Sequence, residues 1–245
     1  MTLPRLSVSM ALAGALFALA ACSPSGDQQA AAPTQAPAPS QADEAAKKLD
    51  TYRQLVRINN DEMATTMGKE IVSRYPDSEA AKEVQQTLPD IEKRWKENSE
   101  KNRLQALWLY QVSPMQGGTQ STATIYSSQP SGNDRVRLVL RRHTEWGQHV
   151  FLYSDAGGFV CKANCTLPVT LDGKSTGIKA FAPPTGEPAL MIRDDKAFIA
   201  ALQKAKKITI DVTMQKGEKK VQLVYEVGGF DADKWQPLPK KGAKK

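Results

Sequence analysis

The stretch Trp108-Leu109-Tyr110-Gln111-Val112 marks the point at which the spacing of apolar residues changes along the chain. Before it, apolar residues recur near helical spacing, and after it they follow a period of two. The first spacing places apolar side chains on one face of a helix, and the second places them on one face of a strand. The sequence therefore predicts an α+β fold, with a helical region at residues 43–107 and a β-rich domain at residues 108–235.

Short strands separated by turn residues are expected throughout the β-rich domain. In Arg135-Val136-Arg137-Leu138-Val139-Leu140 charged and apolar residues alternate, which predicts one solvated and one buried face. Residues 208–212 and 221–227 are expected to form a hairpin around Lys216-Gly217-Glu218. Further strands are predicted at residues 108–112, 122–126, 150–153, 159–161, 167–171 and 189–192, and one helix at residues 196–204, capped by Asp194 or Asp195. This pattern favours a small antiparallel β-sandwich-like domain with one helix.

Proline residues divide the helical region. Tyr75-Pro76-Asp77-Ser78 should end one helix and cap the next with Asp77 or Ser78, and Pro89 is expected near a further boundary. The stretch from Arg74 to Ala81 resembles the joint between tetratricopeptide-type repeats. Stacked repeats usually need about three copies, and one joint is visible here, so the resemblance implies a helical hairpin instead of a solenoid.

The N-terminal residues 1–21 have the pattern of an export signal. A short start carrying Arg5 precedes an apolar run from Val8 to Ala21, which is shorter than the roughly 20 apolar residues of a membrane-spanning helix. The stretch Leu19-Ala20-Ala21-Cys22 resembles the lipobox of bacterial lipoproteins. An ordinary signal peptide with a chance cysteine is the alternative.

The lipoprotein resemblance implies a location as well as a modification. It implies cleavage before Cys22, a diacylglycerol thioether on that cysteine and acylation of the new amino group. Several acyl chains would anchor the protein stably to the membrane. Because Ser23 follows the cysteine, and an aspartate there favours retention in the inner membrane, the resemblance points to the periplasmic face of the outer membrane.

Two flanking segments are too polar to form a core. Residues 22–42 are rich in Ala, Pro, Gln and Ser, which predicts a disordered tether. Residues 236–245 form a basic tail. Removing residues 1–21 removes Arg5 and no acid, so the formal charge falls from +7 to +6. Export and an aromatic content of 7% argue against nucleic acid as a partner.

Cys161 and Cys165 are the cysteines left once Cys22 carries lipid. An even pair in an oxidising compartment predicts a disulfide that closes a small loop. Together with His143 and His149 the pair would also give the four ligands of a structural zinc site. The disulfide is favoured because periplasmic thiols tend to oxidise, so no metal is expected.

Motifs for catalysis are weak. The chain has no Gly-x-Ser-x-Gly turn and no Gly-rich phosphate loop. Glu145 beside Trp146 could belong to a glycan site, but glycoside hydrolysis normally uses a pair of carboxylates. We therefore expect no catalytic residue, no cofactor and no small-molecule substrate.

The β-rich domain loosely resembles small secreted bacterial β domains, among them type VI secretion accessory lipoproteins and invasion-associated-type proteins. The shared elements are a strand ending at Cys161, a helix carrying Phe198 and a last strand spanning residues 221–228. The interpretation is a non-enzymatic envelope lipoprotein that binds a protein partner. A periplasmic inhibitor or immunity protein, which could bind through residues 127–134 or the disulfide loop, and a protein that binds an envelope polymer or has an unrecognised activity remain alternatives.

Overall fold

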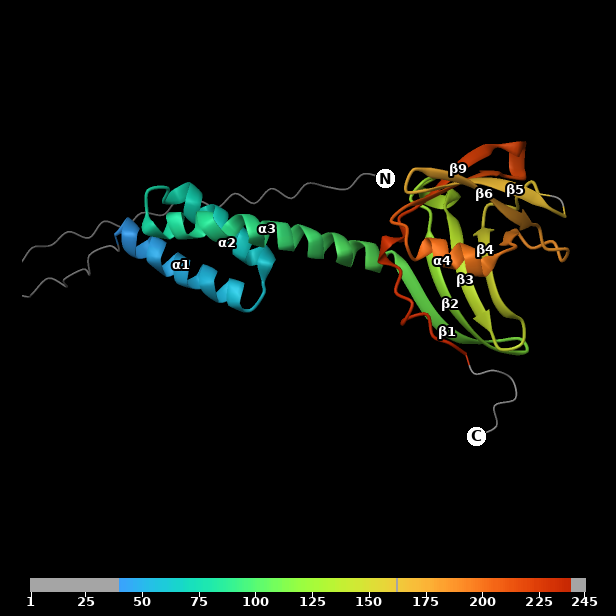
Figure 1. The fold of residues 1–245 in the computed structure, drawn as a ribbon, viewed down its shortest axis with the longest axis horizontal. Helices are drawn as coiled ribbons and strands as arrows, with labels where there is room; N and C mark the ends of the chain where they lie inside the picture. Colours follow the sequence, from blue (N-terminus) through green and yellow to red (C-terminus); the bar gives the residue numbers. More distant parts are fainter. Residues whose placement is uncertain (1–39, 162, 239–245) are drawn as a thin grey trace, which may run out of the picture. The chain divides into compact units, whose positions relative to one another are not determined.

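A computed structural model describes residues 40–161 and 163–238 of the chain (Figure 1). Within them the fold is α+β, as predicted: a helical part precedes a nine-stranded antiparallel sheet, and a fourth helix lies between two strands. In this part of the chain, no helix combines the length and the apolar character needed to cross a membrane. The predicted signal peptide, Cys22, residues 22–39 of the predicted tether and residues 239–245 of the predicted basic tail lie outside the described residues.

Three helices form the N-terminal part: α1 (Gln41–Arg57), α2 (Asp61–Arg74) and α3 (Glu79–Ala106). Helix α1 starts two residues before the predicted start of the helical region. The side chain of Asn60 accepts from the amide of Met63 and caps α2, and that of Ser78 accepts from the amide of Ala81 and caps α3. The helices bury an apolar cluster of their own, made by Ala45, Leu49, Tyr52, Leu55, Ala64, Ile71, Ala80, Ala81, Val84 and Ile91.

The boundary expected near Pro89 was wrong, because α3 continues through this proline. A proline inside a helix removes one backbone hydrogen bond and costs about 3 kcal/mol. Val84 and Ile91 lie on either side of Pro89, and both are buried in the apolar cluster of the helices. Burial of both residues needs an uninterrupted helix, and this burial offsets the local cost of the proline.

The strands form one sheet in the order β1-β2-β3-β4-β7-β6-β5-β8-β9, in which β7 joins the two halves by pairing with β4 and β6. Their bounds are β1 Trp108–Met115, β2 Gly118–Tyr126, β3 Val136–His143, β4 Gly147–Ser154, β5 Cys165–Leu171, β6 Lys174–Phe181, β7 Ala189–Ile192, β8 Ile208–Thr213 and β9 Lys220–Tyr225. Helix α4 (Asp195–Leu202) follows β7 and is capped by Asp194. Short 3-10 turns lie at Gly132–Asp134, Lys216–Glu218 and Val227–Gly229.

One predicted strand was wrong, and one strand of the structure was not predicted. Residues 159–161 form no strand: Phe159 makes one isolated bridge to Met214, and Val160 is exposed. Strand β6 was not predicted, because most of its residues are exposed and its sequence lacks a regular alternation of apolar and polar residues. The residues of β6 have a weak intrinsic preference for strand structure, and pairing with β5 and β7 holds β6 in the sheet.

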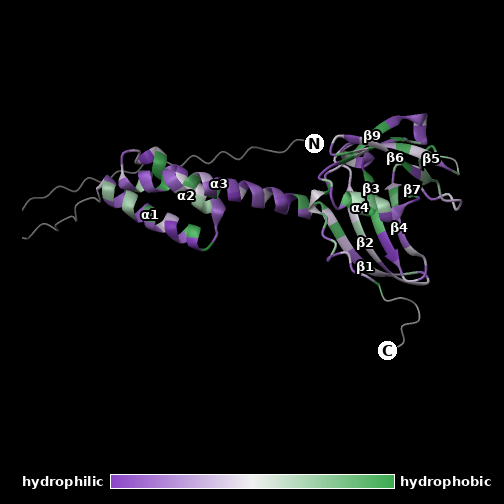
Figure 2. Ribbon diagram, viewed as in Figure 1, coloured by the Kyte–Doolittle hydropathy of each residue, from purple (hydrophilic) through white to green (hydrophobic). Residues whose placement is uncertain are grey.

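One face of the sheet encloses the main apolar core, and hydrophobic and hydrophilic residues alternate along the strands (Figure 2). In β3 the residues Val136, Leu138 and Leu140 point into this core. Helix α4 adds Phe198 and Leu202, and the C-terminal segment adds Trp235. The alternation leaves the opposite face of β3, with Arg137, Val139 and Arg141, directed away from the core.

Candidate functional site

The outward face of β1–β4 and β7 carries a groove of about 820 Å³. We call it the arginine–aromatic groove. Arginine and aromatic side chains from neighbouring strands make up its floor, and a loop that carries Glu187 contributes to its wall. Among the residues that line it are Arg137, Val139, Arg141, Trp146, Phe151 and Tyr153.

The strand register arranges the groove in parallel rows. The central row is apolar and runs through Val139, Phe151 and Met191, which are paired across β3, β4 and β7. Arg137 lies two residues to one side of this row, and Arg141 lies two residues to the other side. An apolar strip therefore lies between two guanidinium groups on one face of the sheet.

Arg137 lies between two tyrosine rings and is neutralised by an acid. Its Cζ atom lies 4.5 Å from the ring centre of Tyr153 and 6.0 Å from that of Tyr126. Its Nη2 atom donates to the carboxylate of Asp155 at 2.6 Å. The rings hold the guanidinium plane, while Asp155 supplies the opposite charge.

Arg141 has a similar setting without the acid. Its Cζ atom lies 5.3 Å from the ring centre of Trp146 and 5.1 Å from that of Phe151. No hydrogen bond or ion pair joins its guanidinium to another described residue. Burial lowers the pKa of its guanidinium, while the charge of Glu187 acts in the opposite direction. Arg141 is thus a half-buried cation whose charge the described residues compensate only weakly.

Two histidines hold Trp146 over this site. The rings of His143 and Trp146 stack with their centres 3.9 Å apart and an angle of 15° between planes. The Nδ1 atom of His143 accepts from the amides of Glu145 and Trp146, so the ring proton is placed on Nε2. The Nε2 atom of His149 lies 2.8 Å from the carbonyl oxygen of Trp146. Both histidines therefore position the turn that carries Trp146.

Unsatisfied donors line up along β3. The Nε atoms of Arg137 and Arg141 and the Nε2 atom of His143 are buried and have no hydrogen-bond partner among the described residues. Most buried polar atoms in proteins are paired, because an unpaired donor costs about 1–3 kcal/mol. Three such atoms on one face of one strand distinguish this face from the rest of the sheet.

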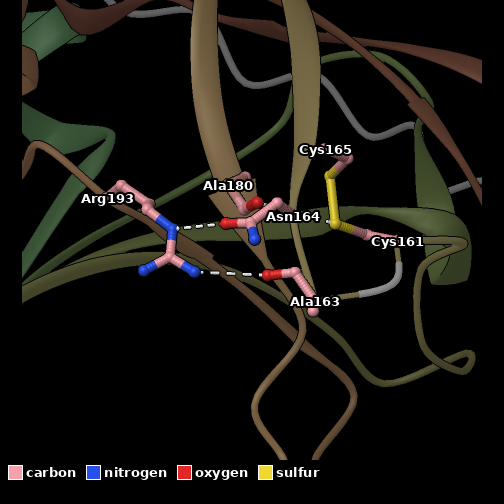
Figure 3. The surroundings of a disulfide bond; sticks show 6 residues. All are labelled: Cys161, Ala163, Asn164, Cys165, Ala180 and Arg193. Atoms are coloured by element: carbon pink, nitrogen blue, oxygen red, sulfur yellow. Dashed lines mark hydrogen bonds between the residues drawn. A yellow bond between two sulfur atoms is a disulfide. The ribbon is translucent and has the colours of Figure 1, made fainter.

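Cys161 and Cys165 are joined by a disulfide at the start of β5 (Figure 3). Arg193, which follows β7, points toward the loop that the disulfide closes: its Nε atom donates to the side chain of Asn164 at 2.8 Å, and its Nη2 atom donates to the carbonyl of Ala163 at 3.2 Å (Figure 3). Arg193 therefore ties the disulfide loop to the end of β7.

The other residues considered from the sequence lie apart from the groove floor. Asp194 caps α4, and Asp195 accepts from the side chain of Gln148. Ser128 and Gln129 of the loop at residues 127–134 exchange backbone hydrogen bonds with Val224 of β9. Within residues 40–161 and 163–238, no group of three or more histidine, cysteine, aspartate or glutamate residues could hold a metal ion.

Sequence reasoning did not identify Arg141 as a candidate site residue. The signal for it was present in the alternating stretch from Arg135 to Leu140, which continues into Arg141. Such alternation is typical of any half-solvated strand, and the sequence does not show which strands pair. The stack of Arg141 with Trp146 and Phe151 depends on the pairing of β3 with β4.

Comparisons with known proteins give little further information. No family model matches the chain, and no curated protein matches it. Among solved structures, one match is invasion associated protein B from Bartonella henselae. The match has a TM-score of 0.36 and 18% identity, and it covers 52% of this chain and 87% of that one.

Proposed function

We propose that this protein is a non-enzymatic binding module of the bacterial cell envelope, anchored to the periplasmic face of the outer membrane through lipid on Cys22. It binds a protein partner in the arginine–aromatic groove. The anchor part of this proposal rests on the Leu19-Ala20-Ala21-Cys22 pattern. The binding part rests on the groove.

The observation that carries the binding role is the state of Arg141. A half-buried cation that makes no ion pair is costly in the free protein, since a partly desolvated charge needs an opposite charge or hydrogen-bond acceptors. A ligand that supplies these acceptors recovers the cost on binding. Tryptophan, tyrosine and arginine are also the residues that contribute most to protein–protein binding energy, and Trp146, Tyr153, Arg137 and Arg141 are among those that line the groove.

The anchor is tested by intact mass measurement and membrane fractionation of the full chain expressed in a Gram-negative host. We expect a mature protein that starts at Cys22, carries three acyl chains and sediments with the outer membrane. Cys22→Ser should be neither lipidated nor cleaved at this site. An unlipidated protein that starts at another residue would contradict the anchor.

Binding is tested with a photo-cross-linking residue at Thr122, which lines the groove. Position Arg57, exposed at the end of α1, provides the control. We expect one protein to be cross-linked in the envelope from position 122 and not from position 57. The cross-link should disappear in Arg141→Gln. Equal cross-linking from both positions would argue against the groove as the binding site.

A further inference from the structure

We propose that the arginine–aromatic groove recognises an extended acidic segment of polypeptide, with one carboxylate at Arg141, an apolar side chain over Val139 and a second carboxylate near Arg137. This inference rests on the proposed binding role and specifies the chemistry of the partner.

Charge decides the sign of the ligand. Arg141 makes no ion pair among the described residues, and of the two groove arginines only Arg137 has an acid in contact, Asp155. A carboxylate that binds Arg141 would form charge-assisted hydrogen bonds of the bidentate kind that guanidinium groups favour. Glu187 lines the same groove and acts on Arg141 by charge alone. Arg141 therefore favours an anion, and Glu187 competes with it. At Arg137 only Nη2 is used by Asp155, and its Nε atom has no partner among the described residues, so this guanidinium can share a second carboxylate with Asp155.

Spacing decides the form of the ligand. Arg137 and Arg141 are four residues apart on β3, which corresponds to about 13 Å at roughly 3.3 Å per residue. An extended polypeptide presents side chains on one face at every second residue, so residues one, three and five of a segment match Arg141, Val139 and Arg137. A small anion would engage one guanidinium and make no use of the apolar row, in which Val139 is 8% exposed and Phe151 and Met191 are partly exposed.

The remaining lining residues suit a peptide backbone. Gln111, Gln120, Thr122 and Thr124 present amide and hydroxyl groups at the β1–β2 side of the groove. Such groups both donate and accept hydrogen bonds, as the backbone of an extended segment requires. Phe151, Met191 and Phe181 extend the apolar row across β4, β7 and β6, where an apolar side chain of the segment would be buried.

The test is a fluorescence anisotropy titration of labelled peptides with the full chain, purified in detergent. The first peptide carries glutamate, leucine and glutamate at alternate positions. The second has glutamines in place of the glutamates, and the third has the same composition as the first with the glutamates adjacent. We expect saturable binding of the first peptide, at least about tenfold tighter than that of the other two, since each charged hydrogen bond contributes roughly a factor of ten or more.

Matched variants locate the binding. Arg141→Gln should weaken binding of the first peptide by about tenfold or more. Arg57→Gln, which makes the same charge change at an exposed site of α1, should leave it unchanged. Glu187→Gln should tighten binding severalfold, because it removes the competing carboxylate. This gain cannot result from a damaged fold, so it keeps the test decisive if Arg141→Gln fails to fold.

Several outcomes would overturn the inference. The first is equal affinity of the protein for the first and the third peptide. The second is a loss of binding in Arg57→Gln that is as large as the loss in Arg141→Gln. The third is displacement of the labelled peptide by a soluble polyuronate or by inorganic phosphate at a lower concentration than unlabelled peptide requires. If position 122 cross-links one envelope protein but the purified protein shows no preference for the acidic peptide, the acidic segment is contradicted and the proposed binding role is supported. Selective peptide binding without a cross-linked protein would support the groove chemistry and contradict the proposed protein partner.

Discussion

Arg141 and Arg142 are adjacent in β3, and their guanidinium groups lie on opposite faces of the sheet. The Nη1 atom of Arg142 donates to the carbonyl oxygen of Trp235 at 2.5 Å, and its Cζ atom lies 3.6 Å from the centre of the Trp235 ring. Trp235 is buried in the main core and donates from Nε1 to the carbonyl of Ser121. Arg142 thus fixes the C-terminal segment to the core side, while Arg141 faces the groove.

This difference predicts that the same substitution affects stability much more at Arg142 than at Arg141. Arg142→Gln should lower the free energy of unfolding by about 1–3 kcal/mol, because it removes a charged hydrogen bond and the contact with Trp235. Arg141→Gln should change stability by about 0.5 kcal/mol or less, because the loss of its contacts with Trp146 and Phe151 is offset by the removal of a half-buried charge that makes no ion pair. Urea denaturation of the two variants provides the comparison. A larger loss in Arg141→Gln would show that Arg141 supports the fold and would weaken the binding argument.

Gly229 packs against the last turn of α3 with no space for a side chain. A Cβ atom at this position would lie 2.2 Å from the carbonyl carbon and oxygen of Leu104, which are backbone atoms and cannot rotate away. At the neighbouring Gly228 the nearest atom, Cα of Lys206, would lie at 3.4 Å, an ordinary contact. The two glycines are therefore a matched pair for testing this contact.

We expect Gly229→Ala to destabilise the protein by about 3 kcal/mol or more, since the backbone must shift to relieve the overlap. Gly228→Ala should cost about 1 kcal/mol or less. Thermal unfolding followed by circular dichroism measures both. Similar melting temperatures for the two variants would mean that the α3 terminus does not contact Val227–Gly229 in solution.

The strands that the sequence predicted well are those with a clear two-residue period. β8 alternates regularly and β3 does so over its first three residues, and the predicted strands at residues 208–212 and 135–140 overlap them. β6 has mostly exposed residues and few apolar ones, so its place depends on its neighbours in the sheet. The spacing of apolar residues predicts a strand only where one face of that strand is buried, because burial then requires apolar residues at every second position.

The groove could not be predicted because it depends on contacts that are distant in sequence. The sequence suggests for Trp146 only a glycan site shared with Glu145, but in the structure it lines the groove and is 43% exposed. Its position follows from the register that places Arg141 opposite His149 and from the stack with His143. Turn residues such as Trp146 have no periodic pattern, so their surroundings are known only once the strands are paired.

Pro89 offers a test of the continuous helix α3. Pro89→Ala should restore a backbone donor and remove the steric conflict with the preceding turn, which raises the free energy of unfolding by about 1–3 kcal/mol. The residue is exposed, so no packing is lost in exchange. The neighbouring exposed residue gives a control, Asp90→Ala, which should change stability by about 0.5 kcal/mol or less. Chemical denaturation that shows Pro89→Ala to be destabilising would contradict an uninterrupted helix at this point.

Asp61 and Arg94 form a paired contact between α2 and α3 that should make stability depend on pH. The Nε and Nη2 atoms of Arg94 donate to the two carboxylate oxygens of Asp61 at 2.7 and 2.5 Å. The side chain of Asp61 is 7% exposed, and this hydrogen bonding lowers its pKa in the folded protein. A lowered pKa means that the ionised carboxylate stabilises the fold above the pKa of an unfolded aspartate, about 3.9, and that this contribution is lost as the pH falls through the folded value.

Asp61→Asn should therefore lower the free energy of unfolding by about 1–2 kcal/mol at neutral pH, and the difference from the unaltered protein should shrink below about pH 4. Glu83 gives a matched control, because Arg53 also lowers the pKa of its carboxyl group but both side chains are exposed to more than 40%. Glu83→Gln should cost about 0–1 kcal/mol at any pH, since exposed pairs contribute little. Urea denaturation between pH 3 and 7 distinguishes the two variants. A pH-independent loss in Asp61→Asn would show that packing around Asp61, and not its charge, connects the helices.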